Sequence, residues 1–220
     1  MTIDQAKKFL DYVMNKKQNN YLSGDDFNFL APIAQMSVLN DRLGNVKKYL
    51  PGAPVPPYGF SINQKSREEL RPLMKKPTVT AVAAGVASYP ADYLYYDAID
   101  VNGVLAKEAS RDEILVMNQS NVKYPSTTYP FFVLHSDGIY VYPNSITSIN
   151  LAYVRTPLTP KWNYTYVNSE QVYSASGSQD FEMGIGTHLE ICAVIAQMAG
   201  LNIGMMDLTQ YFQMAQQEGK

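Results

Sequence analysis

The sequence has few charged residues and a single cysteine. Charged residues make up 17% of the 220 residues, and the net charge is −2, whereas about a quarter of an average globular sequence is charged. This composition gives no basic footprint for binding nucleic acid and no polybasic anchor for a membrane surface. Cys192 has no partner within the chain, so we expect a small buried side chain in a reducing compartment. A reactive thiol would need a nearby base, which the sequence does not identify.

A signal peptide and a long apolar run are also missing from the sequence. The chain begins Met1-Thr-Ile-Asp-Gln-Ala-Lys-Lys8, and an acid and two lysines this early do not match a signal peptide. The apolar stretches are shorter than the roughly 20 residues needed to cross a bilayer. We therefore expect a protein that is soluble, or built into a soluble assembly, without a membrane partner.

Tyrosine is abundant instead, and it is concentrated in the middle of the chain. Twelve of the 17 tyrosines lie between Tyr89 and Tyr173. Protein interfaces favour tyrosine and are depleted in lysine and glutamate, so this composition suits surfaces that become covered. Half-buried strand positions favour tyrosine as well, and for any one residue both interpretations stay open.

The first 76 residues read as helices with a proline-rich connector. Capping-box spacing at Thr2–Gln5 and an N-cap at Ser23 with Asp26 predict two helix starts, and Gly44 is a plausible end of the second helix. Apolar residues recur at helical spacing after each start: Ile3, Ala6, Phe9, Leu10, Val13 and Met14, then Phe27, Leu30, Ile33, Ala34, Val38 and Leu43.

Prolines interrupt this helical region at two places. Pro32 predicts a kink or a restart in the second helix, because it removes one backbone hydrogen bond. Four prolines within residues 51–57 predict an extended connector. A short helix over 66–74 follows, with Ser66 and Glu69 at capping-box spacing.

Residues 77–173 are predicted to form an inserted antiparallel β domain, a small barrel or sandwich. Asn102-Gly103 and Asp137-Gly138 are hairpin signals, because glycine accepts the positive φ of a tight turn. The late strands, 131–134, 139–142 and 148–155, are expected to pair as a meander. Residues 113–117 fit either a strand or a short helix.

Helical patterns return after a polar junction at 174–179. Their apolar residues are expected to share one face: Phe181, Ile185, His188, Leu189, Cys192, Ile195 and Ala196. A last helix is predicted over 205–217, after a tight break at 201–204. The fold class is therefore α+β, with 1–76 and 174–220 as a helical bundle and 77–173 inserted between them.

No residue pattern in the sequence predicts catalysis, metal binding or a cofactor. His135 and His188 lie in different elements, and His188 and Glu190 do not share a helix face. Asp97 and Asp100 are three apart on a predicted strand and so point to opposite faces. No phosphate loop and no nucleophile elbow is present.

Trp162 stands where the last predicted strand leaves the sheet. A tryptophan at such an exit usually closes a small core. An exposed anchor at a partner surface is the alternative. Both interpretations remain open at the level of sequence.

Three segments carry a resemblance to a known family. They are the strings Ile139-Tyr-Val-Tyr-Pro143 and Ile149-Asn-Leu-Ala-Tyr-Val-Arg-Thr-Pro157 with Pro160-Lys-Trp162, the start Ser23-Gly-Asp-Asp-Phe-Asn-Phe-Leu30, and the end 189–204. These segments resemble virion structural proteins of tailed bacteriophages that infect Bacteroides and relatives, including the crAss-like phages. Residues 51–128 match less recognisably.

The resemblance implies a head-to-tail connector, an adaptor or ring protein. Such proteins resemble a helical bundle with an inserted β domain, and they form a ring, often of twelve copies, beneath the portal. The implied partners are further copies of the chain, the portal, neighbouring tail or ring proteins, and passing genomic DNA without sequence-specific binding. The implied location is the virion, after assembly in the host bacterial cytoplasm. No catalytic residue comes with this family, and an enzyme is not expected.

Two other functions remain as alternatives. One is a carbohydrate- or peptide-binding module that uses the tyrosines and Trp162 as a stacking platform. The other is an enzyme, such as a cell-wall hydrolase, using carboxylates such as Glu113. Glycoside hydrolysis needs two carboxyl groups that converge across a cleft, and sequence spacing alone does not reveal such a pair.

Overall fold

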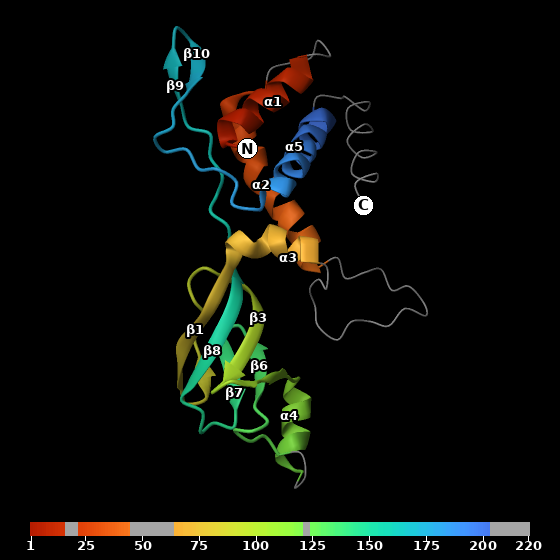
Figure 1. Ribbon diagram of the computed structural model, residues 1–220, viewed down its shortest axis with the longest axis vertical. Helices are drawn as coiled ribbons and strands as arrows, with labels where there is room; N and C mark the ends of the chain where they lie inside the picture. The colour runs from red at the N-terminus through yellow and green to blue at the C-terminus, as the bar shows by residue number, and fades with distance from the viewer. Residues whose placement is uncertain (16–21, 45–63, 121–123, 203–220) are drawn as a thin grey trace, which may run out of the picture. The chain divides into compact units, whose positions relative to one another are not determined.

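The computed structural model describes residues 1–15, 22–44, 64–120 and 124–202, and its fold is α+β (Figure 1). The chain divides into two units, Met1–Pro72 with Pro157–Lys220 and, between them in sequence, Leu73–Thr156. We call them the helical unit and the β unit. The expected connector 51–57, the break at 201–204 beyond Asn202 and the last helix 205–217 lie outside the described residues.

Helices from both ends of the chain make up most of the helical unit. Its elements are α1 Ile3–Asn15, α2 Gly24–Gly44, α3 Gln64–Leu70, β9 Tyr164–Val167, β10 Glu170–Tyr173, η2 Ile185–Thr187 and α5 His188–Asn202. The 3-10 turn η1, Arg71–Leu73, follows α3 and ends at the first residue of the β unit. Both predicted helix starts are confirmed. The Gln5 amide donates to Thr2 Oγ1 at 3.3 Å, and the Asp26 amide donates to Ser23 Oγ at 3.0 Å.

Helix α2 passes through Pro32 as one element, so of the two predicted outcomes, a kink or a restart, the restart is excluded. A proline inside a helix costs about 3 kcal/mol. Burial offsets that cost, because α2 packs against α5 and its residues Phe27, Leu30 and Ala34 are buried. Ile33, expected on the same face, is 44% exposed.

A charged cluster joins three helices of this unit. Arg42 on α2 donates from Nε to Glu69 on α3 at 2.5 Å, and from Nη2 to Glu190 on α5. Glu69 is buried. Helix α3 begins at Gln64 rather than at Ser66 as predicted, and the expected capping residue Glu69 serves as the partner of Arg42.

The prediction that the apolar residues of 181–196 share one helix face is only partly correct. Helix α5 begins at His188, so Phe181 precedes it, and Leu189 and Ile185 are 61% and 81% exposed. Cys192 is buried, as predicted. Burial raises the pKa of its thiol to about 12, which keeps it protonated and unreactive at neutral pH.

The β unit is a nearly closed barrel with one helix. Its strands are β1 Met74–Ala83, β2 Val86–Ala87, β3 Tyr93–Val101, β4 Val104–Leu105, β5 Lys107–Glu108, β6 Phe131–His135, β7 Gly138–Tyr142 and β8 Ser148–Arg155, and its helix is α4 Arg111–Asn118. They are ordered β4-β3-β8-β1-β2-β7-β6-β5, and the β5–β6 pair is parallel. The barrel core contains Ile99, Phe132, Ile139, Val141 and Leu151, among others.

One short segment, 104–108, contains both β4 and β5, the first and last strands of this order. Its first part pairs with β3, and its last part pairs with β6. Between them, the Ala106 amide donates to the Ile99 carbonyl at 2.8 Å and the Lys107 amide to the Pro130 carbonyl at 3.0 Å. The segment therefore provides the closure that an open sheet would lack.

Two details of the predicted meander are wrong. Strand β7 pairs with β2 and β6 rather than with β8, because the β1–β2 hairpin lies between β7 and β8. Gly138 has no positive φ and pairs with His135. A Cβ at Gly138 would lie 2.7 Å from the Ala87 carbonyl oxygen, so glycine is needed there for the close approach of β2. The Asn102-Gly103 turn is confirmed, with φ of 50° and 83°.

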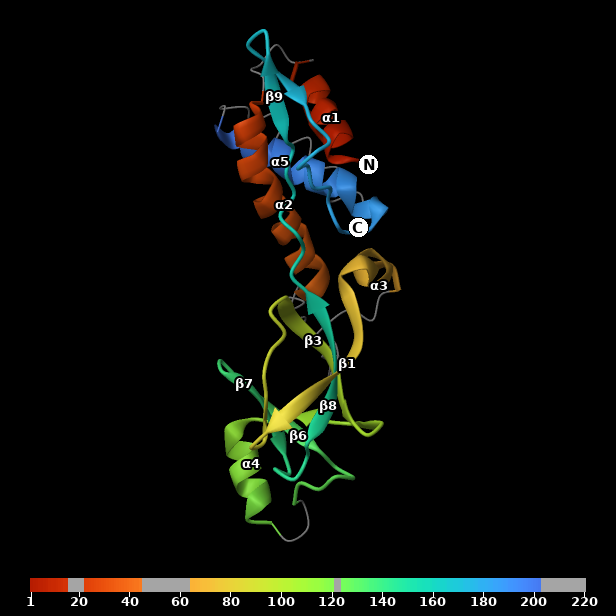
Figure 2. The ribbon, with the colours of Figure 1, turned by 90° about the vertical axis from the view of Figure 1, so that its left-hand side faces the viewer.

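The boundary between the units also differs from the predicted insert 77–173. Residues 157–173 belong to the helical unit, because the β9–β10 hairpin packs on α1 and α2 through side chains described below. Figures 1 and 2 both place the hairpin beside α1. Residues 113–117 are helical, within α4.

Several of the tyrosines in the β unit pack on one another. Tyr93 lies between Tyr89 and Tyr153, with ring centroids 4.6 Å and 5.9 Å away, and the Tyr153 hydroxyl donates to Asp92 at 2.8 Å. Burial, with the neighbouring Tyr89, raises the pKa of Tyr93 to about 12.

Replacing Arg42 by methionine should destabilise the helical unit by about 2–4 kcal/mol, because Glu69 and Glu190 would be left without their cation. Urea unfolding measures the change. The control is Arg71→Met, which removes an ion pair with Glu68 that is 3.3 Å long and exposed; surface pairs contribute about 0–1 kcal/mol. Equal effects from the two variants would contradict the role of Arg42.

Tyr93 should contribute stability that is lost at high pH. Its pKa is raised from the ordinary tyrosine value of 10.0 to about 12, so the contribution is fully present below pH 10 and disappears as the pH rises toward 12. Ultraviolet titration of the folded protein should include a late-ionising tyrosine that Tyr93→Phe removes. In denaturant the two proteins should differ only by one tyrosine that ionises near its usual pKa of ~10. A folded Tyr93→Phe variant with an unchanged late phase would contradict this assignment.

Candidate functional site

The indole of Trp162 is buried in the helical unit, with 5% of its surface exposed. It stacks on Tyr173 at 6.2 Å and packs on Tyr164 at 5.3 Å between ring centroids. On α1, Lys7 Nζ lies 5.4 Å from the indole centroid. Trp162 is thus a core residue, and the alternative of an exposed anchor is wrong.

Hydrogen bonds fix the main chain and the ring of Trp162. Its amide donates to Asn28 Oδ1 at 2.7 Å, and its carbonyl accepts from Asn28 Nδ2 at 3.0 Å. Its Nε1 donates to Asp4 Oδ1 at 3.3 Å. Because Asn28 is on α2 and Asp4 on α1, one residue connects the hairpin to both helices.

The start of α2 touches the hairpin directly. The Gly24 amide donates to Gln171 Oε1 at 2.7 Å, and the Tyr164 hydroxyl donates to Asp25 at 2.7 Å. A Cβ at Gly24 would lie 2.6 Å from the Tyr164 ring. A glycine is therefore required at the point where α2 and β9 meet.

Lys7 is a buried cation on α1, with 1% of its surface exposed. Its Nζ donates to both carboxylate oxygens of Asp11 at 2.7 Å. Burial lowers the pKa of Lys7, while the hydrogen bond and charge of Asp11 act in the opposite direction. The Lys7–Asp11 pair and the indole face together keep this charge in the interior.

A groove of about 690 Å³ lies between α1 and the hairpin. On one side it is lined by Asp4, Lys7, Lys8 and Asp11, and on the other by Tyr166 and the consecutive residues 169–173, with Ser23 and Trp162 completing the lining. Lys8 pairs with Asp4 at 2.7 Å, as Lys7 does with Asp11. The charges on the α1 wall of the groove therefore neutralise each other in pairs. We take this groove as the candidate site.

The two histidines considered in the sequence lie in different surroundings. His188 is buried, and its ring nitrogens lie 3.0 Å from the carbonyl oxygens of Met1 and Met183. His135 is on β6, where its ring lies 4.8 Å from that of Tyr140, edge to face. Each ring therefore has a structural contact, and the two histidines belong to different units.

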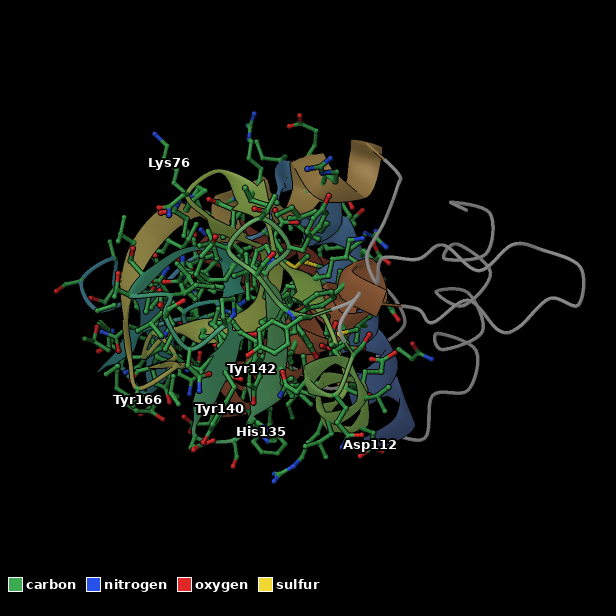
Figure 3. The ribbon with its side chains drawn as sticks, turned by 90° about the horizontal axis from the view of Figure 1, so that it is seen from below. Lys76, Asp112, His135, Tyr140, Tyr142 and Tyr166 are labelled. Atoms are coloured by element: carbon green, nitrogen blue, oxygen red, sulfur yellow. The ribbon has the colours of Figure 1, made fainter. Side chains whose placement is uncertain are left out.

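An aromatic surface of the β unit includes His135, Tyr140 and Tyr142, which Figure 3 labels. Tyr140 of β7 contacts the His135 ring, whereas Tyr142 pairs with Phe131, four positions away from His135 on β6. The Tyr140 hydroxyl donates to Asp137 at 2.7 Å, and this hydrogen bond lowers the pKa of Asp137. This surface has the aromatic composition of a contact area.

The carboxylates considered for catalysis take part in structural hydrogen bonds. Glu113 closes the capping box of α4, accepting from the Ser110 amide at 2.7 Å. Asp100 accepts from Asn150 at 2.7 Å and from the Gly103 amide at 3.1 Å. Among the described residues, no group of three or more His, Cys, Asp or Glu side chains is placed to hold a metal ion.

The hairpin that forms one wall of the groove was not predicted. The sequence predicts only that this segment belongs to the inserted β domain 77–173. Two signals were present: the β-prone residues Tyr164-Thr-Tyr-Val167 and Val172-Tyr173, and Asn168-Ser169 between the strands. Both turn residues have positive φ, 51° and 68°, and asparagine accepts this conformation better than most residues.

Among the described residues, no helix is long and apolar enough to cross a membrane. Comparison of the sequence with models of known protein families gives no match, and a search of curated proteins gives none.

Proposed function

We propose that this chain is a structural virion protein of a tailed bacteriophage, a head-to-tail connector subunit that assembles into a ring. The ring lies below the portal and surrounds the DNA channel, often as twelve copies. Its neighbours are copies of itself, the portal and other tail or ring proteins. Genomic DNA passes through it without sequence-specific contacts.

The observation that carries this proposal is the organisation of the chain. Both ends contribute to one helical unit, and a barrel is inserted between them. This is the arrangement that the family resemblance implies. A fold alone does not determine a function, so the surfaces have to support the proposal as well.

Exposed apolar side chains in the helical unit give such support. Phe29 and Ile33 of α2 are 70% and 44% exposed, and residues four apart on a helix are neighbours on its surface. Ile185 and Leu189 are a second pair with the same spacing. Head-to-tail assembly uses two different patches on each subunit, and these pairs are candidates for the two patches.

The low charge of the chain favours the same function. Surfaces that become covered contain fewer charged residues and more tyrosine than free surfaces. A net charge of −2 is also compatible with a channel, because strong phosphate contacts would hold DNA back.

The structure weakens the alternative of an aromatic binding platform, because Trp162, its central residue, is buried. Stacking of a sugar or peptide on Trp162 would require displacement of Tyr164, Tyr173 or Lys7, since these groups cover the buried indole. The hydrolase alternative is weakened because Glu113 is held in the capping box. We therefore prefer the structural function.

The ring is tested on the purified full chain, alone and with the portal protein of the same virion. Mass photometry over a range of concentrations should give a discrete oligomer built from 24.6 kDa subunits, and negative-stain images should show closed rings. An unrelated protein in place of the portal is the control for specific binding. A protein that stays monomeric at every concentration and does not bind the portal would rule out the proposal.

A further inference from the structure

The β9–β10 hairpin leaves the outer edges of both strands unpaired. The Ser174 amide donates to the Asn163 carbonyl at 2.8 Å, and the strands pair residue by residue without a bulge. Hydrogen-bonded and non-hydrogen-bonded pairs alternate in such a ladder. The backbone groups of residues 164, 166, 171 and 173 therefore point outward, and within the described part of the chain no backbone hydrogen bond reaches them.

These edges lack three of the usual protections against pairing, namely lysine, proline and a bulge. Their remaining protections are the short length of the strands and the single charge of Glu170. The sequences Tyr164-Thr-Tyr-Val167 and Glu170-Gln-Val-Tyr173 contain no lysine and no proline. Tyr166, Val167 and Val172 are 66%, 51% and 44% exposed. The hairpin is thus prepared to pair with another strand.

The two edges have different surroundings. Because consecutive residues 169–173 line the groove, the outer edge of β10 forms its wall opposite α1. An extended segment can add a strand to an exposed sheet edge, and the groove gives access to the β10 edge. The β9 edge is the opposite side of the same hairpin. The two edges are not equivalent, so pairing of β10 with β9 of another copy joins unlike patches, as head-to-tail assembly requires.

Charge also favours β9 as the strand that enters. The lysines of the groove are paired with aspartates of the same helix, so a charged strand would find no free partner on α1. Strand β9 contains no charged residue. Its entry therefore adds no further charge to the groove, whose β10 wall already contains Glu170.

We propose that β9 of one copy pairs antiparallel with β10 of the next copy, in the groove between β10 and α1. This inference rests on the proposed ring and names one contact between its subunits. Full overlap of the strands places Tyr166 opposite Gln171 of the next copy, and Tyr164 opposite Tyr173. Repeated around a ring, the contact joins the hairpins of all subunits into one sheet.

A single contact of this kind should be weak. Stable interfaces bury ~1,600 Å² in total, and four residues of strand edge contribute only part of that. In a closed ring each subunit makes the contact twice, and the last contact to form is intramolecular. We therefore expect pairing to be favoured in the ring over isolated pairs of subunits.

Cysteine cross-linking tests the pairing directly. In the proposed register Thr165 lies opposite Val172 of the next copy as a non-hydrogen-bonded pair, with Cα atoms ~4.5 Å apart, within the range for a disulfide. Single variants Thr165→Cys and Val172→Cys are mixed under assembly conditions and oxidised. Neither can form the disulfide within its own hairpin, and the native Cys192 is buried.

The expected product is a disulfide between the two variants, identified by mass spectrometry of the linked peptides. Links between identical variants would instead indicate symmetric pairing, of β9 with β9 or of β10 with β10, and would overturn the proposal. Assembled rings without any link would overturn it too, while leaving the proposed ring function intact. Absence of both rings and links would count against both proposals.

A pair of variants at Tyr166 tests the contribution of the outward backbone groups. Tyr166→Pro removes an outward N–H, which an edge strand tolerates, and Tyr166→Thr removes the same side chain but keeps the N–H. The proline variant should associate about five- to tenfold more weakly per contact than the threonine variant, with similar circular dichroism and thermal midpoints. Equal association of the two folded variants would overturn the strand pairing.

Discussion

Trp162 connects three elements of the helical unit, and the position of the β9–β10 hairpin depends on it. Its ring contacts Tyr164 and Tyr173 of the hairpin, and Lys7 of α1 covers its face. Its main chain is held by Asn28 of α2. An isolated two-stranded hairpin is only marginally stable in water, so these contacts are what keep the strands in place. They also keep α1 at a distance from β10, which leaves the groove between them.

In the β unit, the segment 104–108 holds the strands together by closing the sheet into a barrel. The segment 104–108 pairs with β3 at one end and β6 at the other. In the β unit Tyr89, Tyr93 and Tyr96 are half-buried, whereas Tyr95, Tyr124 and Tyr129 are exposed. The Tyr153 hydroxyl donates to Asp92, and the Tyr89 hydroxyl donates to the His135 carbonyl. The abundance of tyrosine in the sequence therefore has two physical origins, packing inside the β unit and exposed edges such as that of Tyr166 in the helical unit.

Local chemistry made several elements predictable. Side-chain caps at Thr2 and Ser23 gave the helix starts, and Asn102-Gly103 gave a hairpin, because these features involve neighbouring residues only. The pairing of β7 with β2, and the union of 157–173 with the helices, depend on residues far apart in sequence. Arg42 binds Glu190 across 148 positions, and Asn28 binds Trp162 across 134. No periodicity in a single sequence reports such contacts. The groove was missed for the same reason, since its walls come from α1 and from a hairpin that follows the barrel.

The scarcity of charge has a specific location in the structure. Helix α1 contains Asp4, Lys7, Lys8 and Asp11 in two internal pairs, whereas the strands opposite contain a single charged residue, Glu170. In a monomer, this distribution would leave an unprotected strand edge beside a helix that has no net charge to repel a partner. An exposed edge of this kind promotes association, including unwanted aggregation. Aggregation through the edge is avoided only when another strand regularly covers it. The hairpin thus connects the composition of the chain to the proposed assembly: residues that would protect a free edge are missing at the place where another subunit is expected to bind.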